Sequence, residues 1–482
     1  MTQSIVVQVG QCGNQVGCRF WDLALREYAH VKANKVPFIE NSVQSFFRSS
    51  DESSDAEENT LDSQQSLKAR AVLIDMEEGV IKELLKSPLK HIFDNKQLIT
   101  DVSGSGNNWA VGHKEYGSQY EEKISELIRR EAEKCDCLQC FFLLHSMGGG
   151  TGSGLGTKIL HILADDFPDV HRFVSTIFPS TDDDVITSPY NTLLAIHQLT
   201  EYADCVLPIE NEALIDICNQ VSKAIPQKKT RIEKSTGLSI QPESVITSSV
   251  GTTTRRNKQI FDHMNNIVAN LLLNLTSSSR FSGSLNVDLQ EIVMNLIPYP
   301  RMHYLVSSLT PLYALIDANI PSRRLDQMFT EAFSQHHHLL KTDPRSGVYL
   351  TCALLVRGQV QISDIRRNID RLENGLVFVP WNNDRWKTGL CSVPPVGHPY
   401  SLLTLSNNTC INSSFINVKK RFMQMYRKKA HLHHFLQVDG MGVDDFQEAI
   451  LSVTNLIGEY KAVEDLVYEN PPPPPPRLKV LV

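Results

Sequence analysis

A stretch of small residues, SMGGGTGSG at residues 146–154, has the composition of a phosphate-binding loop. An apolar run at residues 140–145 precedes it and predicts a buried strand, and residues 155–166 favour a helix that stops before Pro168. A strand that turns into a helix N-terminus directs backbone N–H groups and the positive end of the helix dipole toward one spot. Glycines let the backbone approach phosphate oxygens closely. The stretch therefore predicts a phosphate site.

The charge that neutralises the phosphates must come from outside this loop. No lysine follows the glycines in the order that a P-loop requires, so Mg²⁺ is the simplest source. Residues 71–77 form an apolar run that ends in carboxylates, and a carboxylate at the carboxyl end of a parallel strand can hold Mg²⁺ through water. A solvated strand end explains these acids equally well. A flexible Gly/Ser linker is a poor alternative for residues 146–154, because linkers lack a flanking buried strand and helix.

A second glycine-rich turn lies at residues 10–17, between a strand expected at residues 4–9 and a helix expected to run to about residue 28. Its spacing differs from the dinucleotide-binding fingerprint. Two such turns, with a Gly/Asn loop at residues 103–108, can nevertheless converge on one ligand. Repeated strand, polar loop and helix units up to about residue 220 predict an α/β fold with a doubly wound parallel sheet. The ligand would lie across the carboxyl ends of its strands.

The remaining chain divides by composition. Residues 41–66 are rich in Ser, Asp and Glu and predict a disordered surface insertion, and the polar, basic residues 222–258 predict a second insertion. An almost entirely apolar segment at 261–275 predicts a buried helix between two domains. Beyond it we expect strands at 302–309, 348–356, 376–381 and 402–405, and helices at 363–373, 415–436 and 443–467. The expected organisation is a nucleotide-binding domain (1–260), a core helix (261–279), an intermediate α/β domain (280–412), C-terminal helices (413–470) and a polyproline tail (471–482).

The composition of the 482-residue chain limits its function class. The net charge of −7 argues against a general nucleic-acid-binding protein. No apolar run approaches the roughly 20 residues of a membrane span, and the N-terminus lacks the basic region of a signal peptide. Ten cysteines without a regular framework are typical of a reducing compartment. We therefore expect a cytoplasmic protein that binds neither membrane nor nucleic acid.

Four motifs together resemble the tubulin family. They are GQCGNQ at 10–15, GNNW at 106–109, GGGTGSG at 148–154 and GSLNVD at 283–288. The resemblance covers nearly the whole chain apart from the two insertions and the last dozen or so residues. It is strongest to the epsilon branch of the family, through GSGNNWAVGH at 104–113, DHMNNIVAN at 262–270 and KKAHLHH at 428–434. The expected fold is thus tubulin-like, with a GTPase domain, a core helix, a second α/β domain and a C-terminal helical hairpin.

The resemblance implies a site for GTP or GDP with Mg²⁺. Glu77 corresponds to the acid that holds Mg²⁺ through water, and Asn211 and Asn265 correspond to the pair that contacts the guanine edge. Phe261 falls where tubulins place an aromatic residue that stacks on the base. The residues implied in the first loop and the phosphate cradle are Gly10, Gln11, Cys12, Asn107, Ser146, Gly148, Gly149, Gly150, Thr151 and Gly152.

The resemblance also implies hydrolysis in trans, because in tubulins the next subunit supplies a carboxylate to the nucleotide. Glu291 matches the alpha-type catalytic acid, and Asp288 is expected to support the attacking water. At a helix start the two carboxylates would share a face. The alternative is that both are N-terminal helix acids favoured by the dipole. We prefer catalysis, acting on the GTP of a neighbouring subunit.

Several positions depart from the family pattern. Ser188 replaces the acid that usually contacts the ribose, and Asp184 is expected to take over part of that role. The loop at 311–329 that corresponds to the lateral contact looks shortened, and polyproline replaces the acidic tail. We therefore expect the chain not to build ordinary microtubule lattice.

The leading hypothesis from the resemblance is a GTP-binding tubulin of the cytoskeleton, located at the centrosome, centriole and basal body. It would support centriole assembly and doublet and triplet microtubules, with delta-tubulin, possible alpha/beta-tubulin and centriolar proteins as partners. One alternative is a GTP-locked structural or capping subunit without turnover. A remote alternative is a Rossmann-type oxidoreductase, but its ribose-binding acid is missing about 20 residues after the first glycine loop, where the sequence is His30, Val31 and Lys32.

Overall fold

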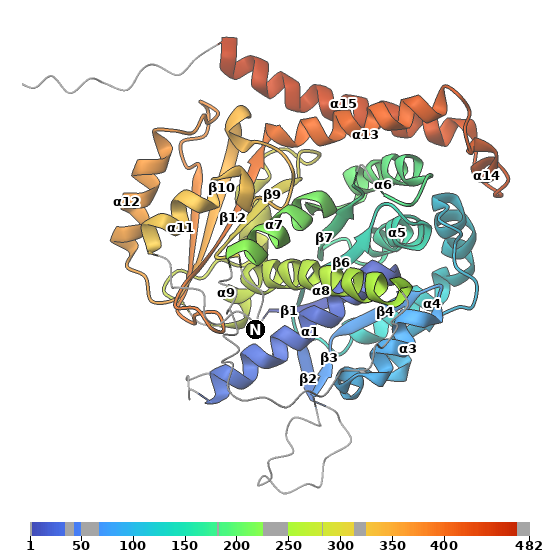
Figure 1. The fold of residues 1–482 in the computed structure, drawn as a ribbon, viewed down its shortest axis with the longest axis horizontal. Coiled ribbons are helices and arrows are strands. Elements are labelled where there is room, and N and C mark those ends of the chain that lie inside the picture. The colour runs from blue at the N-terminus through green and yellow to red at the C-terminus, as the bar shows by residue number, and fades with distance from the viewer. Residues whose placement is uncertain are drawn as a thin grey trace, which may run out of the picture.

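A six-stranded parallel sheet forms the centre of the N-terminal half (Figure 1). The computed structural model describes residues 2–33, 43–49, 67–180, 183–224, 249–281, 283–312 and 324–469. In spatial order the strands are β5 (Leu98–Thr100), β4 (Ala71–Asp75), β1 (Gln3–Val9), β6 (Leu138–Ser146), β7 (His171–Phe178) and β8 (Cys205–Glu210). Strand order runs in opposite directions on the two sides of β1. The predicted doubly wound sheet is therefore confirmed, and its reversal point lies beside β1.

The strands are buried on both faces, which explains why their sequences are almost continuously apolar. Along β1, Ile5 and Val7 belong to one hydrophobic core, whereas Val6 belongs to the other. The first core contains helices α4 (Gly117–Ala132), α5 (Gly156–Asp166) and α6 (Ser188–Tyr202). The second contains α1 (Gly10–Ala33), α3 (Glu78–Lys86), α7 (Asn211–Ala224) and α8 (Ser249–Leu275). Short helical turns complete this half: η1 (Pro88–Ile92), η2 (Asn95–Gln97), η3 (Val111–Tyr116) and η4 (Thr151–Leu155).

A second, mixed sheet of four strands follows α8. Its spatial order is β11 (Trp386–Cys391), β10 (Tyr349–Arg357), β12 (Ser401–Asn408) and β9 (Leu305–Thr310). The helices of this part are α9 (Ser277–Arg280), α10 (Leu289–Leu296), α11 (Leu325–Ala332) and α12 (Ile362–Glu373), with the short turns η5 (Gln335–His337), η6 (Pro344–Ser346) and η7 (Thr409–Ile411). This is the second α/β unit that the sequence predicted.

The predicted strand at 376–381 is wrong. These residues make a single bridge to the sheet, between Phe378 and Tyr349. Pro380 lacks the N–H group that a longer ladder would need. The strand beside β10 is instead β11, whose sequence WKTGLC mixes polar residues and a glycine and so gave no strand signal.

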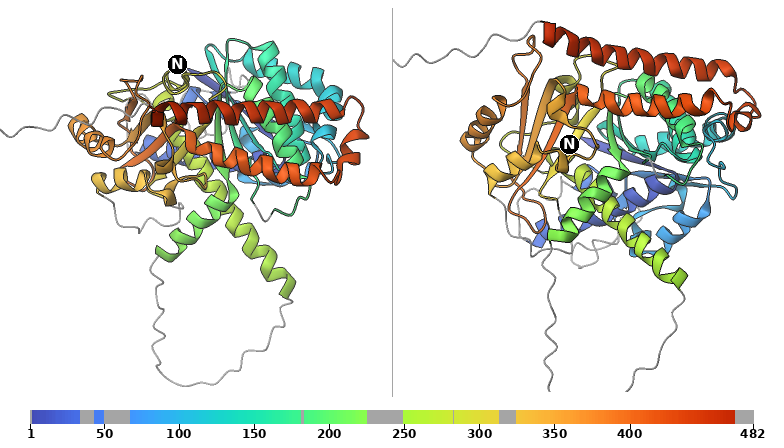
Figure 2. Two further views of the ribbon diagram at one scale, coloured as in Figure 1. Left: turned by 90° about the horizontal axis from the view of Figure 1, so that it is seen from above. Right: turned by 45° about the horizontal axis from the view of Figure 1, so that its top comes forward.

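Two long helices lie antiparallel across the outside of both sheets, α13 (Asn412–Tyr426) and α15 (Val443–Glu469), and the short α14 (Leu432–Leu436) lies at their turn (Figures 1 and 2). The prediction of one helix from 415 to 436 is wrong. Lys429 and His431 adopt positive φ angles of 52° and 56°, which end the helix between α13 and α14. The hairpin packs on α6, where Tyr190 meets Phe422 and Phe446 edge to face.

The two predicted insertions also need correction. Val43, Phe46 and Phe47 are buried in the core, and β2 (Phe47–Ser49) pairs with β3 (Leu67–Ala69), so the first insertion starts later than residue 41. Helix α8 begins at Ser249 rather than near residue 261, so the end of the second insertion is helical. The rest of the two insertions (41–42, 50–66 and 225–248), most of the expected lateral loop (313–323) and the polyproline tail lie outside the described residues. Of the described helices, none combines the length and apolarity needed to cross a bilayer.

Candidate nucleotide site

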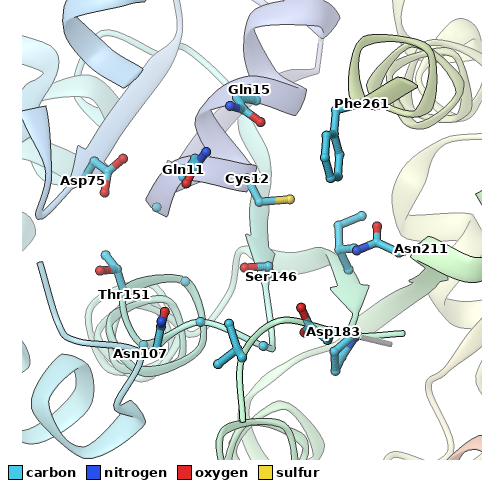
Figure 3. Close-up of a pocket in the computed structure, with 18 of the residues that line it drawn as sticks. Gln11, Cys12, Gln15, Asp75, Asn107, Ser146, Thr151, Asp183, Asn211 and Phe261 are labelled. Carbon is cyan, nitrogen blue, oxygen red and sulfur yellow. The ribbon is translucent and has the colours of Figure 1, made fainter. Parts of the chain in front are cut away.

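A cavity of about 400 Å³ opens at the carboxyl ends of the parallel strands, next to the reversal point at β1. This is where open α/β sheets bind ligands, and the volume lies in the range of small-molecule sites. Residues that follow β1, β4, β6, β7 and β8 all reach it, and one side of α8 closes it (Figure 3). Its lining includes Gly10, Gln11, Cys12, Gln15, Asp75, Glu77, Ser105, Gly106, Asn107, Ser146, Gly148, Gly149, Gly150, Thr151, Gly152, Pro179, Asp183, Asn211, Phe261 and Asn265.

Close backbone packing explains why the two loops under the cavity need glycine. Gly10 has a φ of +72°, and a Cβ there would lie 3.1 Å from the backbone nitrogen of Gly152. A Cβ at Gly150 would lie 2.5 Å from the backbone nitrogen of Asn108. The loops after β1 and β6 therefore touch each other and the loop after β5, and any side chain at these glycines would separate them.

Side-chain hydrogen bonds hold these loops in register. The hydroxyls of Ser105 and Thr151 are 2.9 Å apart. Asn191, at the start of α6, donates from Nδ2 to the carbonyl oxygens of both Asn107 (2.8 Å) and Gly148 (2.9 Å). Asn191 is fully buried, so these bonds replace the water that its amide would otherwise bind. The loop carrying Asn107 is thus fixed beside the glycine-rich loop.

The cavity carries carboxylates but no side-chain cation. Among the described residues that line it, none is Lys or Arg, whereas Asp75, Glu77 and Asp183 are acids. Oδ2 of Asp75 is buried without a hydrogen-bond partner, and burial raises the pKa of this carboxyl to about 6. Oxygens of this kind are the ligands that Mg²⁺ prefers. An anionic ligand bound here would need such a cation, so the donor set fits a shared Mg²⁺–phosphate site.

The thiol and the imidazole near the loops supply neither a nucleophile nor a positive charge. Burial raises the pKa of Cys12 to about 12, so its thiol stays protonated. Burial lowers the pKa of His145, which lies under Gly156, to about 4, so its ring is neutral near pH 7. Phosphates would therefore be held by backbone N–H groups and hydroxyls at the loops.

The opposite end of the cavity is suited to a planar base. Phe261 remains 53% exposed although it lines the cavity, and Asn211 lies on the same side (Figure 3). Asn265, one turn after Phe261 on α8, also lines the cavity. Amides offer both donors and acceptors, which a guanine edge requires. Nearby, Arg19 on α1 pairs with Asp262 on α8 at 3.2 Å and links the two helices behind this wall.

All but three of the predicted site residues line this one cavity. The exceptions are Asp184, Asp288 and Glu291. Asp183 lines the cavity instead of Asp184, and its Oδ2 lies 2.9 Å from the position that a Cβ of Gly148 would take. Ser188 is fully buried near the same glycine but does not line the cavity.

Sequence reasoning missed four residues of the site: Gln15, Ser105, Asp183 and Asn191. It placed carboxylates at the end of residues 71–77 but assigned the metal role to Glu77 and not to Asp75. Gln15 and Asp75 had a usable signal. Gln15 lies one helical turn after Gln11 and therefore on the same face of α1. Asp75 is the last residue of β4 and so lies at the ligand-binding edge of the sheet.

Asp288 and Glu291 lie at the start of α10, near the amino ends of the parallel strands and opposite the cavity. Asp288 caps this helix: Oδ1 accepts from the backbone N–H of Leu289 (3.0 Å) and Oδ2 accepts from Nε2 of Gln139 (2.6 Å). Gln139 is near the start of β6, whereas Ser146 at its end lines the cavity. At the rise of a β-strand these positions are roughly 23 Å apart. Neither carboxylate can reach the cavity of its own chain.

Comparison with known proteins identifies the family. Residues 3–219 match the Tubulin/FtsZ family GTPase domain, and residues 300–420 match the Tubulin C-terminal domain. The chain is 59% identical to the tubulin epsilon chain of Homo sapiens and 58% identical to that of Mus musculus, in both cases over 482 residues and the full length of each protein. It is 34% identical to the tubulin beta-1 chain of Chondrus crispus, over 96% of this chain and 94% of the relative. The chain therefore belongs to the tubulin family of GTP-binding proteins, and it shares more with epsilon chains than with the beta chain compared.

Proposed function

We propose that this protein is an assembly GTPase, which holds a guanine nucleotide in its cavity and uses Glu291 to promote hydrolysis in a neighbouring subunit. Asn211 and Asn265 would contact the guanine edge, and Phe261 would stack on the base. The loops around Gly10 and Gly150 would hold the phosphates through backbone N–H groups. The glycine packing and the polar wall described above support these roles.

The observation that carries this proposal is the position of Glu291 near the amino ends of the parallel strands, on the side of the subunit opposite the cavity. A head-to-tail arrangement of subunits brings the cavity side of one subunit against the opposite side of the next, which carries α10. In such an arrangement Glu291 would face the cavity of the neighbouring subunit, not its own. There its carboxylate would orient and deprotonate water, a contribution worth about 10²–10⁴-fold in rate.

The metal belongs to the same proposal. Mg²⁺ would be held beside Asp75 and Glu77 and would supply the positive charge that the cavity walls lack. Among the residues described, no group of three or more His, Cys, Asp or Glu side chains forms a metal site by itself. The cation would therefore depend on phosphate oxygens and water for its other ligands.

The cellular role is proposed from similarity to the epsilon chains. We propose a cytoskeletal protein of the centriole and basal body that supports doublet and triplet microtubules. Its partners would be other tubulins, in particular delta-tubulin and the alpha/beta dimer, together with centriolar proteins. Identity near 59% over the full length of an epsilon chain supports a shared role. Membership of the tubulin family also removes the support for a Rossmann-type oxidoreductase.

The test is to measure the nucleotide carried by the freshly purified protein and the phosphate released when tubulin partners are added. Glu291→Ala is compared with the wild type, and Met294→Ala serves as the control, because Met294 is 73% exposed on the same helix and carries no charge. We expect bound guanine nucleotide in all three proteins. Partner-dependent phosphate release should fall by about 10²–10⁴-fold in Glu291→Ala only. A site without nucleotide would overturn the proposal.

The second candidate function is a GTP-locked structural or capping subunit. It is favoured by Ser188, which replaces the usual ribose-contacting acid and is buried behind the cavity wall. This function predicts bound GTP that is not hydrolysed in either the wild type or Glu291→Ala, with or without partners.

A further inference from the structure

Glu291 is already engaged in the isolated chain. Its Oε2 lies 2.5 Å from Nζ of Lys387, which projects from β11 of the second sheet. The two residues are far apart in sequence and meet because α10 packs against β10, the neighbour of β11. The side chains are 45% and 30% exposed, so the pair lies at the surface and is accessible to another subunit.

The two acids at this helix start therefore differ in what they can do. Both carboxylate oxygens of Asp288 are occupied within the chain, one by the helix cap and one by Gln139. This residue is an anchor of α10, and the predicted role in supporting water does not fit its contacts. Glu291 keeps its other oxygen available at the surface, and Lys387 is its ion-pair partner.

Lys387 reduces the electrostatic repulsion between the Glu291 carboxylate and the nucleotide of a neighbouring subunit. A lone carboxylate that approaches a neighbouring triphosphate is repelled, and the repulsion grows as water leaves the interface. The ion pair of Glu291 and Lys387 has no net charge, and its ammonium group attracts the phosphates. An ammonium group at this distance also restricts the rotamers of the glutamate, so the carboxylate stays at one place on the surface.

We propose that Lys387 is a positioning residue for the reaction, which holds Glu291 and offsets its negative charge when α10 meets the nucleotide of a neighbouring subunit. This inference rests on the proposed function. It adds a residue on β11, where the sequence pattern indicated neither a strand nor a site.

The first test measures binding and does not depend on turnover. The wild type and the variants Lys387→Met, Lys387→Arg, Glu291→Gln and Glu291→Gln/Lys387→Met are tested for association with two probes that carry a non-hydrolysable GTP analogue. The probes are an alpha/beta-tubulin dimer and a second copy of this chain. Lys387→Met leaves a lone carboxylate at the interface and should weaken association about tenfold. Lys387→Arg should bind like the wild type. The double variant should bind within about twofold of Glu291→Gln, because the repelled charge is gone.

The second test uses the same proteins with GTP-loaded partners. Lys387→Met should slow partner-dependent phosphate release at least tenfold in the presence of Glu291, and it should have no further effect in the Glu291→Gln background. Nucleotide content and circular dichroism of each variant show whether the fold is retained.

Each outcome decides a different point. If the wild type releases phosphate and Glu291→Gln does not, but Lys387→Met behaves like the wild type, only the role of Lys387 is overturned. The same holds if Lys387→Met weakens association equally in both backgrounds, because the lysine then acts on the partner directly. If the wild type neither associates with a probe nor releases phosphate, the proposed function is overturned together with this inference.

Discussion

A buried carboxylate flanked by two arginines connects the nucleotide-binding half to the second sheet. Glu27 on α1 is 3% exposed, and Arg280 on α9 and Arg357 on β10 are 5% and 1% exposed. Nη1 of Arg280 donates to Oε2 of Glu27 at 2.5 Å, and Nη2 of Arg357 donates to Oε1. Both guanidinium groups also lie over the ring of Phe281. Three segments from distant parts of the sequence are thus joined at one acid.

Replacing Glu27 with glutamine should be strongly destabilising. The substitution preserves shape but leaves two buried guanidinium groups without a counter-charge, and removing one partner of a buried ion pair costs about 3–5 kcal/mol. Domain stabilities are about 5–15 kcal/mol, so the loss is a large fraction of the total. Burial by itself would raise the pKa of Glu27, but the charges of Arg280 and Arg357 outweigh burial and lower it. The stabilisation is therefore complete above the usual glutamate pKa of about 4.3 and is lost only as pH falls below that value.

The assay is urea unfolding at pH 7, with the fluorescence of buried tryptophan as the signal. Asp22→Asn is the matched control, because Asp22 lies on the same helix and pairs with Arg26 at 3.0 Å at the surface. An exposed pair of this kind should cost less than about 1 kcal/mol. A Glu27→Gln protein within about 1 kcal/mol of the wild type would refute the argument that the two arginines depend on this acid.

Three further predictions concern the cavity and a buried histidine. Gly150→Ala should abolish nucleotide retention in the purified protein, because the added Cβ would clash with the adjacent loop. Gly79→Ala is the control and should retain nucleotide, because a Cβ there has no neighbour within 4 Å. Equal retention in the two variants would contradict the packing argument. Phe261→Ala should weaken guanine-nucleotide binding roughly tenfold in a competition assay, since stacking on an aromatic ring is worth about 1–3 kcal/mol per base, and Phe261→Tyr should bind normally. Burial lowers the pKa of His338 to about 4, so as pH falls below 6.5 this histidine is protonated in the unfolded chain before it is protonated in the folded one. The free energy of unfolding should therefore decrease by up to about 1.4 kcal/mol for each unit that the pH falls between 6.5 and 4. His338→Asn should reduce the difference in urea midpoint between pH 7 and pH 5, and the exposed His434→Asn should leave it unchanged.

The sequence was most informative where the signal is local. A buried strand, a glycine-rich turn and a helix start follow one another within a few residues around Gly10 and Gly150, and each loop lies where it was predicted. The doubly wound sheet follows from the repetition of such units. The predictions failed where a local pattern was ambiguous. Pro380 limits an apolar segment to a single bridge, and β11 has too few apolar residues to resemble a strand.

Tertiary structure decided which of several similar residues reach the site. Asp183 lines the cavity and Asp184 does not, although they are neighbours with the same side chain. Their difference depends on the local backbone conformation at the two residues, which no spacing rule specifies. The sequence placed carboxylates at the end of residues 71–77, and the pairing of β4 with β1 brings Asp75 to the cavity beside the loop that carries Gly10.

Residue types and turn chemistry thus determined from the sequence alone that the chain has glycine-rich loops at the carboxyl ends of the strands of an α/β sheet, because glycine, capping and apolar periodicity act over a few residues. Strand order and register decided the rest, because contacts such as that of Glu291 with Lys387 join segments distant in sequence. The separation of Glu291 from the cavity of its own chain has the same origin. It follows from the length and direction of β6, which places Gln139 near the amino end of the strand and Ser146 at its carboxyl end.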